Sequence, residues 1–191
     1  ASDVYKRQGE NTIVVASGAN AKLTPEDIDE TVFDGASVVL TQLEVPVATN
    51  VAALRKAKAK GVLTVFNAAP APTEPLPDEL WGLCDVLCPN EPELQLLTCR
   101  KVETDSEAEE ACGELLNRGV GAVLLTRGRR GCLLARKEGC IRVAVPEALR
   151  STPVDTTGAG DAFLGALAPL IASGSTLEAA LPGAVEVAST S

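Results

Sequence analysis

The stretch "SVVLTQLEVPVATNVAALRKAKAKGVLTVFN", Ser37 to Asn67, decides the fold class because it holds a strand, a helix and a second strand in succession. β-Branched residues predict strands at Ser37–Leu43 and Val62–Asn67. The helix between them ends at Gly61, directly after a lysine-rich last turn, and both features are typical of a helix C-terminus. This succession indicates the α/β class.

The same alternation continues along the chain and predicts a three-layer α/β/α fold around a mostly parallel central sheet. In such sheets ligands bind beyond the carboxyl ends of the strands, so motifs at strand ends are the candidates for function. The further expected elements are strands at Thr12–Ser17, Cys84–Asn90 and Gly121–Thr126, a helix from Pro25 capped by Thr24, a short helix near Trp81, helices in 91–99 and 106–119, a hairpin over 131–145 turning at Glu138-Gly139, and two helices after Gly160.

Composition separates the chain from nucleic-acid-binding and membrane proteins. Of its 191 residues, 46% are hydrophobic and 23% are charged, which is typical of a globular domain with a sizeable core. The formal net charge of −9 disfavours binding to nucleic acid or to an anionic membrane. No apolar run approaches the roughly 18 residues that a membrane-spanning helix needs. We therefore expect a soluble, cytoplasmic protein with no nucleic-acid or membrane partner.

The absence of histidine excludes several classes of enzyme. The chain has no His, which removes Ser-His-Asp and Cys-His nucleophile systems and the HExxH zinc proteases. It also lacks the GxxxxGK[ST] phosphate loop, the HRD and DFG motifs of protein kinases, and a GxGxxG dinucleotide fingerprint.

The cysteines are expected to be buried, reduced thiols. No two of them form a CxxC pair, and without histidine a zinc site is improbable. Disulfides would require a secreted context that nothing else indicates. The six residues are Cys84, Cys88, Cys99, Cys112, Cys132 and Cys140.

Both ends of the sequence suggest a piece of a longer reading frame. Residues 1–8, "ASDVYKRQ", match no helix or strand period, and one back-translation of "DVYKRQ" resembles the transposon end used in preparing sequencing libraries. We interpret them as an adaptor read through as protein and leave them out of the fold prediction. The other end, "AVEVASTS", stops inside a predicted helix. We expect residues 9–191 to be one domain, incomplete at both ends.

The strongest candidate motif is "TGAGDAF", at the start of an apolar helix. Gly158, Ala159 and Gly160 let backbone N–H groups converge, and the helix adds its positive end. Such a turn stabilises a phosphoryl group in transfer, and Asp161 could accept the proton of an attacking hydroxyl. The alternative is a helix-capping Asp after a glycine-rich turn.

Three weaker motifs follow other predicted strands. Asn90 and Glu93 in "NEPE" share one helix face and suit a Mg²⁺–water shell and a nucleotide phosphate, although capping explains them equally well. Glu44 in "QLE" could bind a polyol or simply be solvated. The loop "TRGRRG" permits close approach of a ligand to its backbone or forms a hairpin-type turn; it consists of Thr126, Arg127, Gly128, Arg129, Arg130 and Gly131.

In this order, the motifs resemble those of the PfkB carbohydrate kinases. "DTTGAGDAF" looks like the carboxyl-terminal signature of that family, "NEPE" matches its N-x-x-E and "TRGRRG" its T-x-G-x-x-G. The stretches "GENTIVVASGAN", "QLEVP", "FNAAPA" and "LCDVLCPNE" resemble the ribokinase branch. The resemblance covers residues 9–191 and implies a ribokinase-like fold and ATP-dependent phosphorylation of D-ribose at O5.

The resemblance also implies a role for each motif. Asp161 would be the catalytic base and would touch the sugar together with Glu44, and residues 158–160 would form the anion hole. Asn90 and Glu93 would organise ATP phosphate and Mg²⁺, the latter indirectly. Residues 126–131 and Gly160 would line the nucleotide site. Asp155 and Thr157 correspond to positions that hold an activating K⁺.

Departures from the family pattern leave alternatives open. The amino-terminal part with a further sugar-binding Asp, a GGxGxN motif and a β-sheet lid is missing, and so is the last portion. Because these parts are missing, we expect the 191-residue chain to be inactive. Family dimers pair through the lid, so we expect the parent protein to be a homodimer. Val185 stands near the place of an adenine-contacting Asn. The remaining alternatives are a fructokinase or nucleoside kinase, a nucleotide-binding module without catalysis, and a structural fragment.

Overall fold

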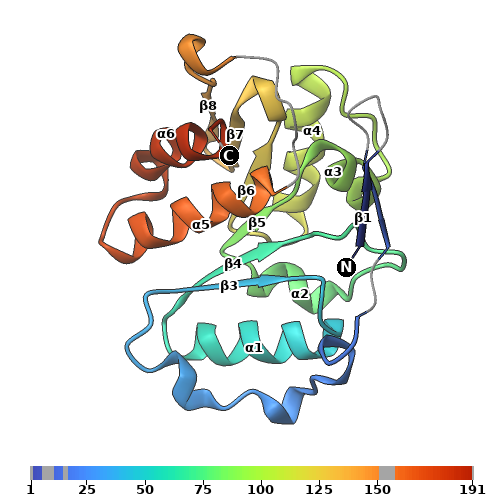
Figure 1. The fold of residues 1–191 in the computed structure, drawn as a ribbon. Helices are drawn as coiled ribbons and strands as arrows, with labels where there is room; N and C mark the ends of the chain where they lie inside the picture. Colours follow the sequence, from blue (N-terminus) through green and yellow to red (C-terminus); the bar gives the residue numbers. More distant parts are fainter. Residues whose placement is uncertain (1, 6–10, 15–16, 151–157, 191) are drawn as a thin grey trace.

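The described residues of the computed structural model, 2–5, 11–14, 17–150 and 158–190, form a six-stranded sheet and a separate two-stranded sheet (Figure 1). The large sheet has the order β3-β4-β5-β6-β7-β8, in which β3 to β6 are parallel and β7 and β8 antiparallel. The predicted α/β class and mostly parallel sheet are confirmed. The strands are β1 (Ser2–Tyr5), β2 (Asn11–Val14), β3 (Val38–Gln42), β4 (Leu63–Asn67), β5 (Val86–Cys88), β6 (Ala122–Thr126), β7 (Cys132–Arg136) and β8 (Gly139–Val143).

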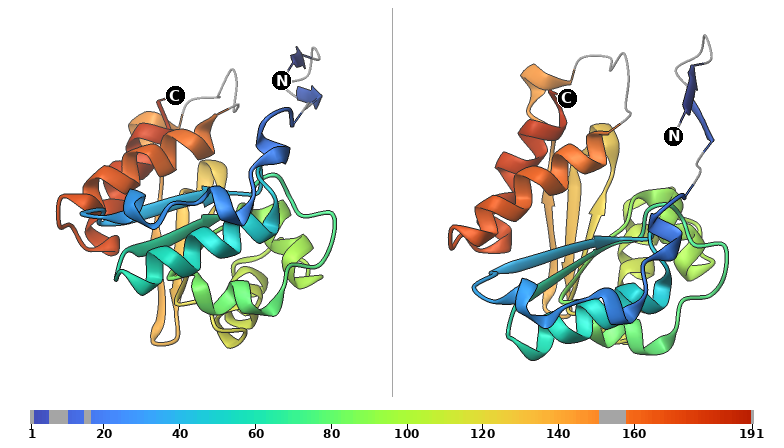
Figure 2. Two further views of the ribbon diagram at one scale, coloured as in Figure 1. Left: turned by 90° about the horizontal axis from the view of Figure 1, so that it is seen from below. Right: turned by 60° about the horizontal axis from the view of Figure 1, so that its bottom comes forward.

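Helices cover both faces of the large sheet, as the two views in Figure 2 show. One apolar cluster joins α1, α2, α3 and α4 to one face, with Leu54, Leu94 and Leu115 fully buried. A second cluster joins α5 and α6 to the other face, around Leu167 and Leu181. The helices are α1 (Val47–Ala59), α2 (Asp78–Leu83), α3 (Glu91–Thr98), α4 (Asp105–Asn117), α5 (Ala159–Ala172) and α6 (Leu177–Ala188).

Alternation along each strand decides which helices its side chains meet. In β4, Val65 packs in the α5–α6 cluster and Phe66 in the α1–α4 cluster. In β6, Leu124 and Leu125 divide in the same way. Successive side chains of a strand point to opposite faces of the sheet. Because both faces are covered by helices, both sets of side chains are apolar, and the strands appear in the sequence as nearly continuous hydrophobic runs.

Local sequence signals set several helix ends. The side chain of Thr104 accepts a hydrogen bond from the Glu107 N–H at 3.2 Å, and the Glu107 carboxylate accepts one from the Thr104 N–H at 2.8 Å. This reciprocal cap satisfies two amides at the start of α4. After α1, Gly61 has φ +72° and turns the chain into β4, as its position behind the lysines predicts.

Two expectations about local structure are wrong. The hairpin turns at Lys137-Glu138, because Arg136 pairs with Gly139, so Gly139 belongs to β8. The helix expected from Pro25 is only the 3-10 turn Pro25–Asp27, because none of its residues is buried in the core that would stabilise a longer helix. Ser2–Tyr5 pair antiparallel with Asn11–Val14, and the interpretation of residues 1–8 as an adaptor stays a prediction. Residues 15–16 of the first expected strand lie outside the described residues.

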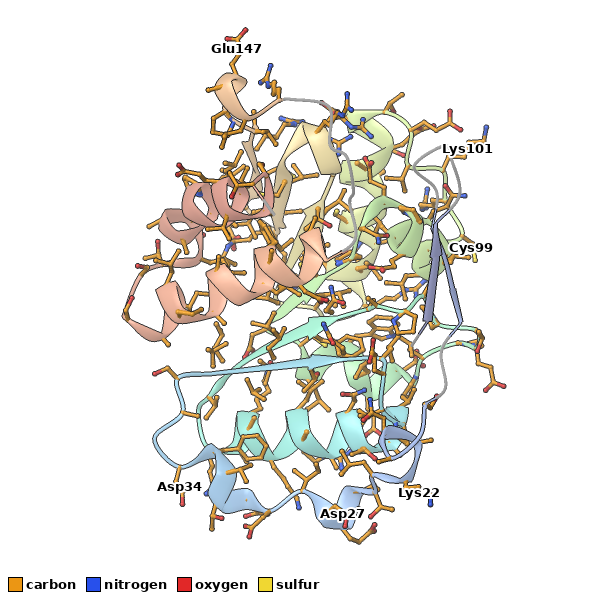
Figure 3. All side chains as sticks on the ribbon, viewed as in Figure 1. Lys22, Asp27, Asp34, Cys99, Lys101 and Glu147 are labelled. Atoms are coloured by element: carbon orange, nitrogen blue, oxygen red, sulfur yellow. The ribbon has the colours of Figure 1, made fainter. Side chains whose placement is uncertain are left out.

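All six cysteines are free thiols, but the expectation that all are buried is wrong for two of them. Cys99 is exposed at the end of α3, and its side chain is labelled in Figure 3. Cys140 is exposed on β8, the edge strand of the sheet. Among the described residues no helix has the length and apolar character to cross a bilayer.

Candidate active site

The carboxyl ends of β3 to β6 lie along one edge of the sheet, and α5 begins beside the end of β3. The contact is direct, because Gln42, the last residue of β3, donates a hydrogen bond from Nε2 to Oδ1 of Asp161 at 3.1 Å. With adjacent strands about 4.8 Å apart, the ends of β3 and β6 are separated by roughly 14 Å. The expected motifs at strand ends therefore border one elongated edge.

The start of α5 has the form that the glycine-rich motif predicts. Gly158 has φ +83° and ψ −4°, a left-handed conformation that favours glycine, and its carbonyl accepts the Ala162 N–H at 2.8 Å. The amides of residues 159–161 belong to the first helical turn, where no carbonyl of the helix itself can accept them. Gly160 and Asp161 are exposed, while Phe163 and Leu164 anchor the helix in the core. An anion at this helix start would meet the backbone amides of the first turn and the positive end of the helix.

Asn90 and Glu93 form a closed pair at the start of α3. Asn90 Oδ1 accepts the Glu93 N–H at 2.8 Å, and the Glu93 carboxylate accepts the Asn90 N–H and Nδ2 at 2.9 Å each. The capping arrangement anticipated as the alternative reading is thus present. Burial raises the pKa of Glu93, which is 6% exposed.

Any role of this pair toward a metal ion is indirect. Both oxygens of Glu93 already accept hydrogen bonds from Asn90, while Asn90 itself is exposed. Among the described residues no three acidic, cysteine or histidine side chains gather as metal ligands. The Glu93 carboxylate therefore fits a contact with Mg²⁺ through water better than direct coordination.

The Thr126–Gly131 loop lies directly beside this pair. Thr126 forms a parallel bridge with Asn90, and its N–H donates to the Pro89 carbonyl at 2.9 Å. The loop continues as the 3-10 turn Gly128–Arg130 and closes where the Arg127 N–H donates to the Gly131 carbonyl at 2.8 Å. The "NEPE" and "TRGRRG" motifs, far apart in sequence, are therefore neighbours at the ends of β5 and β6.

The side chain of Arg127 is buried beside the loop and forms ion pairs with two helix starts. The side chain is 4% exposed and donates from Nε to Glu91 at 2.9 Å and from Nη1 to Asp105 at 2.5 Å. Since Thr126 shares the face of β6 that meets α5, Arg127 points to the opposite face, toward α3 and α4. Arg130 also pairs with Glu91, whereas Arg129 is exposed. The guanidinium of Arg127 joins the loop to the starts of α3 and α4, while its buried Nη2 has no hydrogen-bond partner among the described residues.

The remaining expected site residues divide into three cases. Glu44 is exposed in the loop after β3, two residues beyond Gln42. Asp155 and Thr157, expected to hold K⁺, lie outside the described residues. Val185 is 3% exposed in the core of α6, so its side chain has no surface to offer to an adenine ring.

Two polar side chains of this edge were missed in the sequence. Gln42 and Asn67 are paired in register at the ends of β3 and β4, on the face that meets α5. Asn67 is 9% exposed, donates from Nδ2 to the Cys88 carbonyl at 2.8 Å and accepts the Ala69 N–H at 3.1 Å. A polar residue that ends an apolar strand was the available signal, and it marks both positions.

Comparison with known proteins finds both related sequences and similar structures. The model of the pfkB family carbohydrate kinases matches residues 3–191. A ribokinase of Staphylococcus aureus (strain COL) is 40% identical over 161 residues, covering 83% of this chain and 51% of the relative. A ribokinase of Mus musculus is 39% identical over 171 residues, with 88% and 52% covered. A deoxyribokinase of Salmonella typhi is 37% identical over 177 residues, with 92% and 56% covered.

The solved structures agree with these relatives. The structure of Arabidopsis thaliana ribokinase complexed with ribose and ATP has a TM-score of 0.87 at 33% identity, covering 98% of this chain and 60% of that one. The chain spans about half the length of the curated relatives that it matches. With a family model that matches almost every residue and relatives well above 30% identity, the chain belongs to the pfkB family of carbohydrate kinases.

Proposed function

We propose that the protein to which this chain belongs transfers the γ-phosphoryl group of ATP to the primary 5-hydroxyl of D-ribose. The observation that carries the proposal is the position of Asp161, exposed in the first turn of α5, next to the left-handed turn at Gly158 and facing the strand ends. A base and a group of amides directed at one place are what phosphoryl transfer to an alcohol requires.

In the proposed reaction, the oxygen of the sugar hydroxyl attacks the γ-phosphorus while the bond from that phosphorus to the β-phosphate oxygen breaks. Asp161 takes the hydroxyl proton, and ADP leaves with the electron pair of the broken bond. The amides of Gly158, Ala159 and Gly160 face the phosphoryl oxygens as their charge spreads, and the α5 dipole adds to this stabilisation. A loose transition state needs only a modest base, because the proton departs late.

The other motifs would hold the nucleotide. Asn90, exposed at the start of α3, and the backbone of the Thr126–Gly131 loop adjoin each other and offer polar groups to phosphates. Mg²⁺, when bound with ATP, would neutralise phosphate charge. We also propose K⁺ as an activator near residues 155 and 157, a cytoplasmic location, and a homodimer of the whole protein.

Ribose is preferred as substrate because relatives named ribokinase reach 40% and 39% identity, and Glu44 beyond the end of β3 would contact the sugar. The competing substrate is deoxyribose, since a relative at 37% identity is named deoxyribokinase. The two sugars differ in one hydroxyl, so direct comparison of kcat/KM separates them.

The test uses a chimera in which residues 17–190 of this chain replace the corresponding residues of the Staphylococcus aureus ribokinase. We expect ATP-dependent formation of ribose 5-phosphate, detected by phosphorus NMR, and a greater kcat/KM for ribose than for deoxyribose. Asp161→Asn should lower kcat by about 10²–10⁴-fold, the range for loss of a general base, with unchanged ATP binding. Asp78→Asn, at another exposed Asp in a helical first turn, is the matched control.

Three results would contradict the proposal. A folded chimera that phosphorylates neither sugar would refute the kinase assignment for this segment. Equal turnover of the Asp161→Asn and Asp78→Asn variants would remove Asp161 as the base. Preference for deoxyribose would overturn the choice of ribose alone.

A further inference from the structure

Gln42 makes a side-chain contact with Asp161 that spans 119 residues of sequence. Its Nε2 donates to Oδ1 of Asp161 at 3.1 Å, from the last residue of β3 to the first turn of α5. Asp161 is otherwise exposed at its helix start, where an unrestrained carboxylate can adopt several rotamers. The amide of Gln42 is therefore the group that selects one orientation of this carboxylate among the described residues.

The backbone of Gln42 is held firmly enough to act as an anchor. Its carbonyl accepts Nδ2 of Asn50, a buried residue of α1, at 2.8 Å. The next residue, Leu43, donates its N–H to the Ala69 carbonyl at 2.8 Å. On the other side Gln42 pairs in register with Asn67 of β4. A donor on such a fixed strand end can impose its geometry on a partner that is attached to a different element.

Asn67 secures the neighbouring strand without competing for Asp161. Both ends of its side-chain amide are occupied, Nδ2 by the Cys88 carbonyl and Oδ1 by the Ala69 N–H. Gln42, Asn67 and Cys88 thus form a paired row at the ends of β3, β4 and β5, next to the start of α5. Within this row, Gln42 donates its side-chain N–H to Asp161 in the first turn of α5.

We propose that Gln42 is a positioning residue for Asp161, an inference that rests on the proposed kinase function. By donating to Oδ1, the amide leaves Oδ2 for the hydroxyl that is to be deprotonated. An amide suits this task because it donates a directional bond but carries no charge, so it restrains the carboxylate without neutralising it. The contribution lies in orientation, and misplacement of a reacting group is costly in rate.

The role predicts a separation between kcat and KM. Loss of the Gln42 amide should lower kcat about 10- to 100-fold, because a hydrogen bond to a charged group contributes at that level. The KM for ATP should stay the same, since the nucleotide motifs at β5 and β6 lie at the other end of the strand edge. In the Asp161→Asn background the same change should have no further effect.

The variants are made in the chimera and measured by single-turnover kinetics. Gln42→Leu keeps the size of the side chain and removes the donor. Gln42→Glu keeps the size but presents a second carboxylate, so it should lose as much activity as the Leu variant. Gln95→Leu, on the exposed face of α3, is the matched control and should behave as wild type.

A second measurement, on the 191-residue chain itself, does not require turnover. NMR couplings should show one χ1 rotamer of Asp161 in the wild type and averaging between rotamers in Gln42→Leu. The side-chain amide resonances of Gln42 should shift in Asp161→Asn, while those of Gln95 stay in place.

The outcomes separate this inference from the function on which it rests. If Asp161→Asn loses activity but Gln42→Leu or Gln42→Glu turns over like wild type, positioning by Gln42 is wrong and the kinase proposal stands. If Gln42→Leu lowers activity equally in the Asp161→Asn background, the residue acts through packing and the inference also fails. If Asp161→Asn keeps full activity, the proposed function itself is wrong. Unchanged Asp161 rotamers in Gln42→Leu would refute the inference whatever the turnover.

Discussion

Gly131 should be the most sensitive glycine of the loop after β6. Its φ is +82° and its ψ is −124°, a combination that side chains avoid. A Cβ placed there would overlap the carbonyl oxygen of Val143 and lie 2.9 Å from the carbonyl carbon. That carbonyl cannot retreat easily, because Val143 pairs with Cys132 at the end of the β7–β8 ladder. Alanine at 131 must therefore distort either the loop or the ladder.

Gly128 in the same loop supplies a matched control. Its φ is +51°, but a Cβ there meets nothing within 4 Å. Gly128→Ala should cost about 1 kcal/mol of unfolding free energy for the left-handed conformation alone. Gly131→Ala should cost roughly 3–5 kcal/mol, because backbone strain of about 1–3 kcal/mol is joined by an overpacking cost of similar size. For a domain of this length these values correspond to losses in Tm of about 3 °C and about 10 °C.

The assay is urea unfolding followed by the fluorescence of Trp81, the single Trp of the chain, which is 3% exposed. The same variants are titrated with a fluorescent ATP analogue, and Gly131→Ala should bind it more weakly than Gly128→Ala. Equal stability of the two variants would refute the reasoning, since it would mean that the carbonyl of Val143 moves aside without cost.

Two further predictions concern acid stability and thiol reactivity. Burial alone would raise the pKa of Asp85, but hydrogen bonds from Lys58 and Thr64 outweigh it and hold the pKa below its ordinary value. This stabilisation is complete above the unfolded pKa of about 3.9 and is lost as pH falls through the folded pKa. In urea unfolding, Asp85→Asn should therefore have a lower free energy of unfolding than wild type at pH 7, and the difference should shrink in acid. A difference that stays constant with pH would contradict this prediction. Iodoacetamide should modify Cys99 and Cys140 in the native chain, and peptide mass spectrometry identifies the modified sites. Burial protects the other thiols and raises the pKa to about 12 in Cys84, Cys112 and Cys132. Reaction at a third cysteine before unfolding would contradict this prediction.

Elements with a strong local pattern were predictable to within a residue or two. The strand expected at Ser37–Leu43 is Val38–Gln42, and the helix expected to end before Gly61 ends at Ala59. These elements are defined by side-chain period and by signals at their own ends, which act over a few residues. The hairpin turn was misplaced by one residue, because its register depends on pairing with β6 and β7 as well as on the glycine.

The local geometry of the candidate site was predictable where one short segment carries it. Gly158 and the first turn of α5 have the geometry that the glycine-rich motif predicts, and Asn90 with Glu93 has the capping geometry. The ion pairs of Arg127 were not predictable, because Glu91 and Asp105 lie on two other elements, and its nucleotide contact stays a prediction. Gln42 was missed for the same reason, since its partner Asp161 lies on another element.

The sequence by itself determined the succession of strands and helices, the left-handed turns at glycine and the polar groups at strand ends, because these depend on interactions between near neighbours in the chain. Only the tertiary structure decided that β3 meets the start of α5, that Asn90 adjoins Thr126, and that Arg127 turns away from the strand edge. These contacts depend on the order of strands in the sheet and on the face to which each side chain points. Packing of the whole chain sets both, and no short segment specifies either.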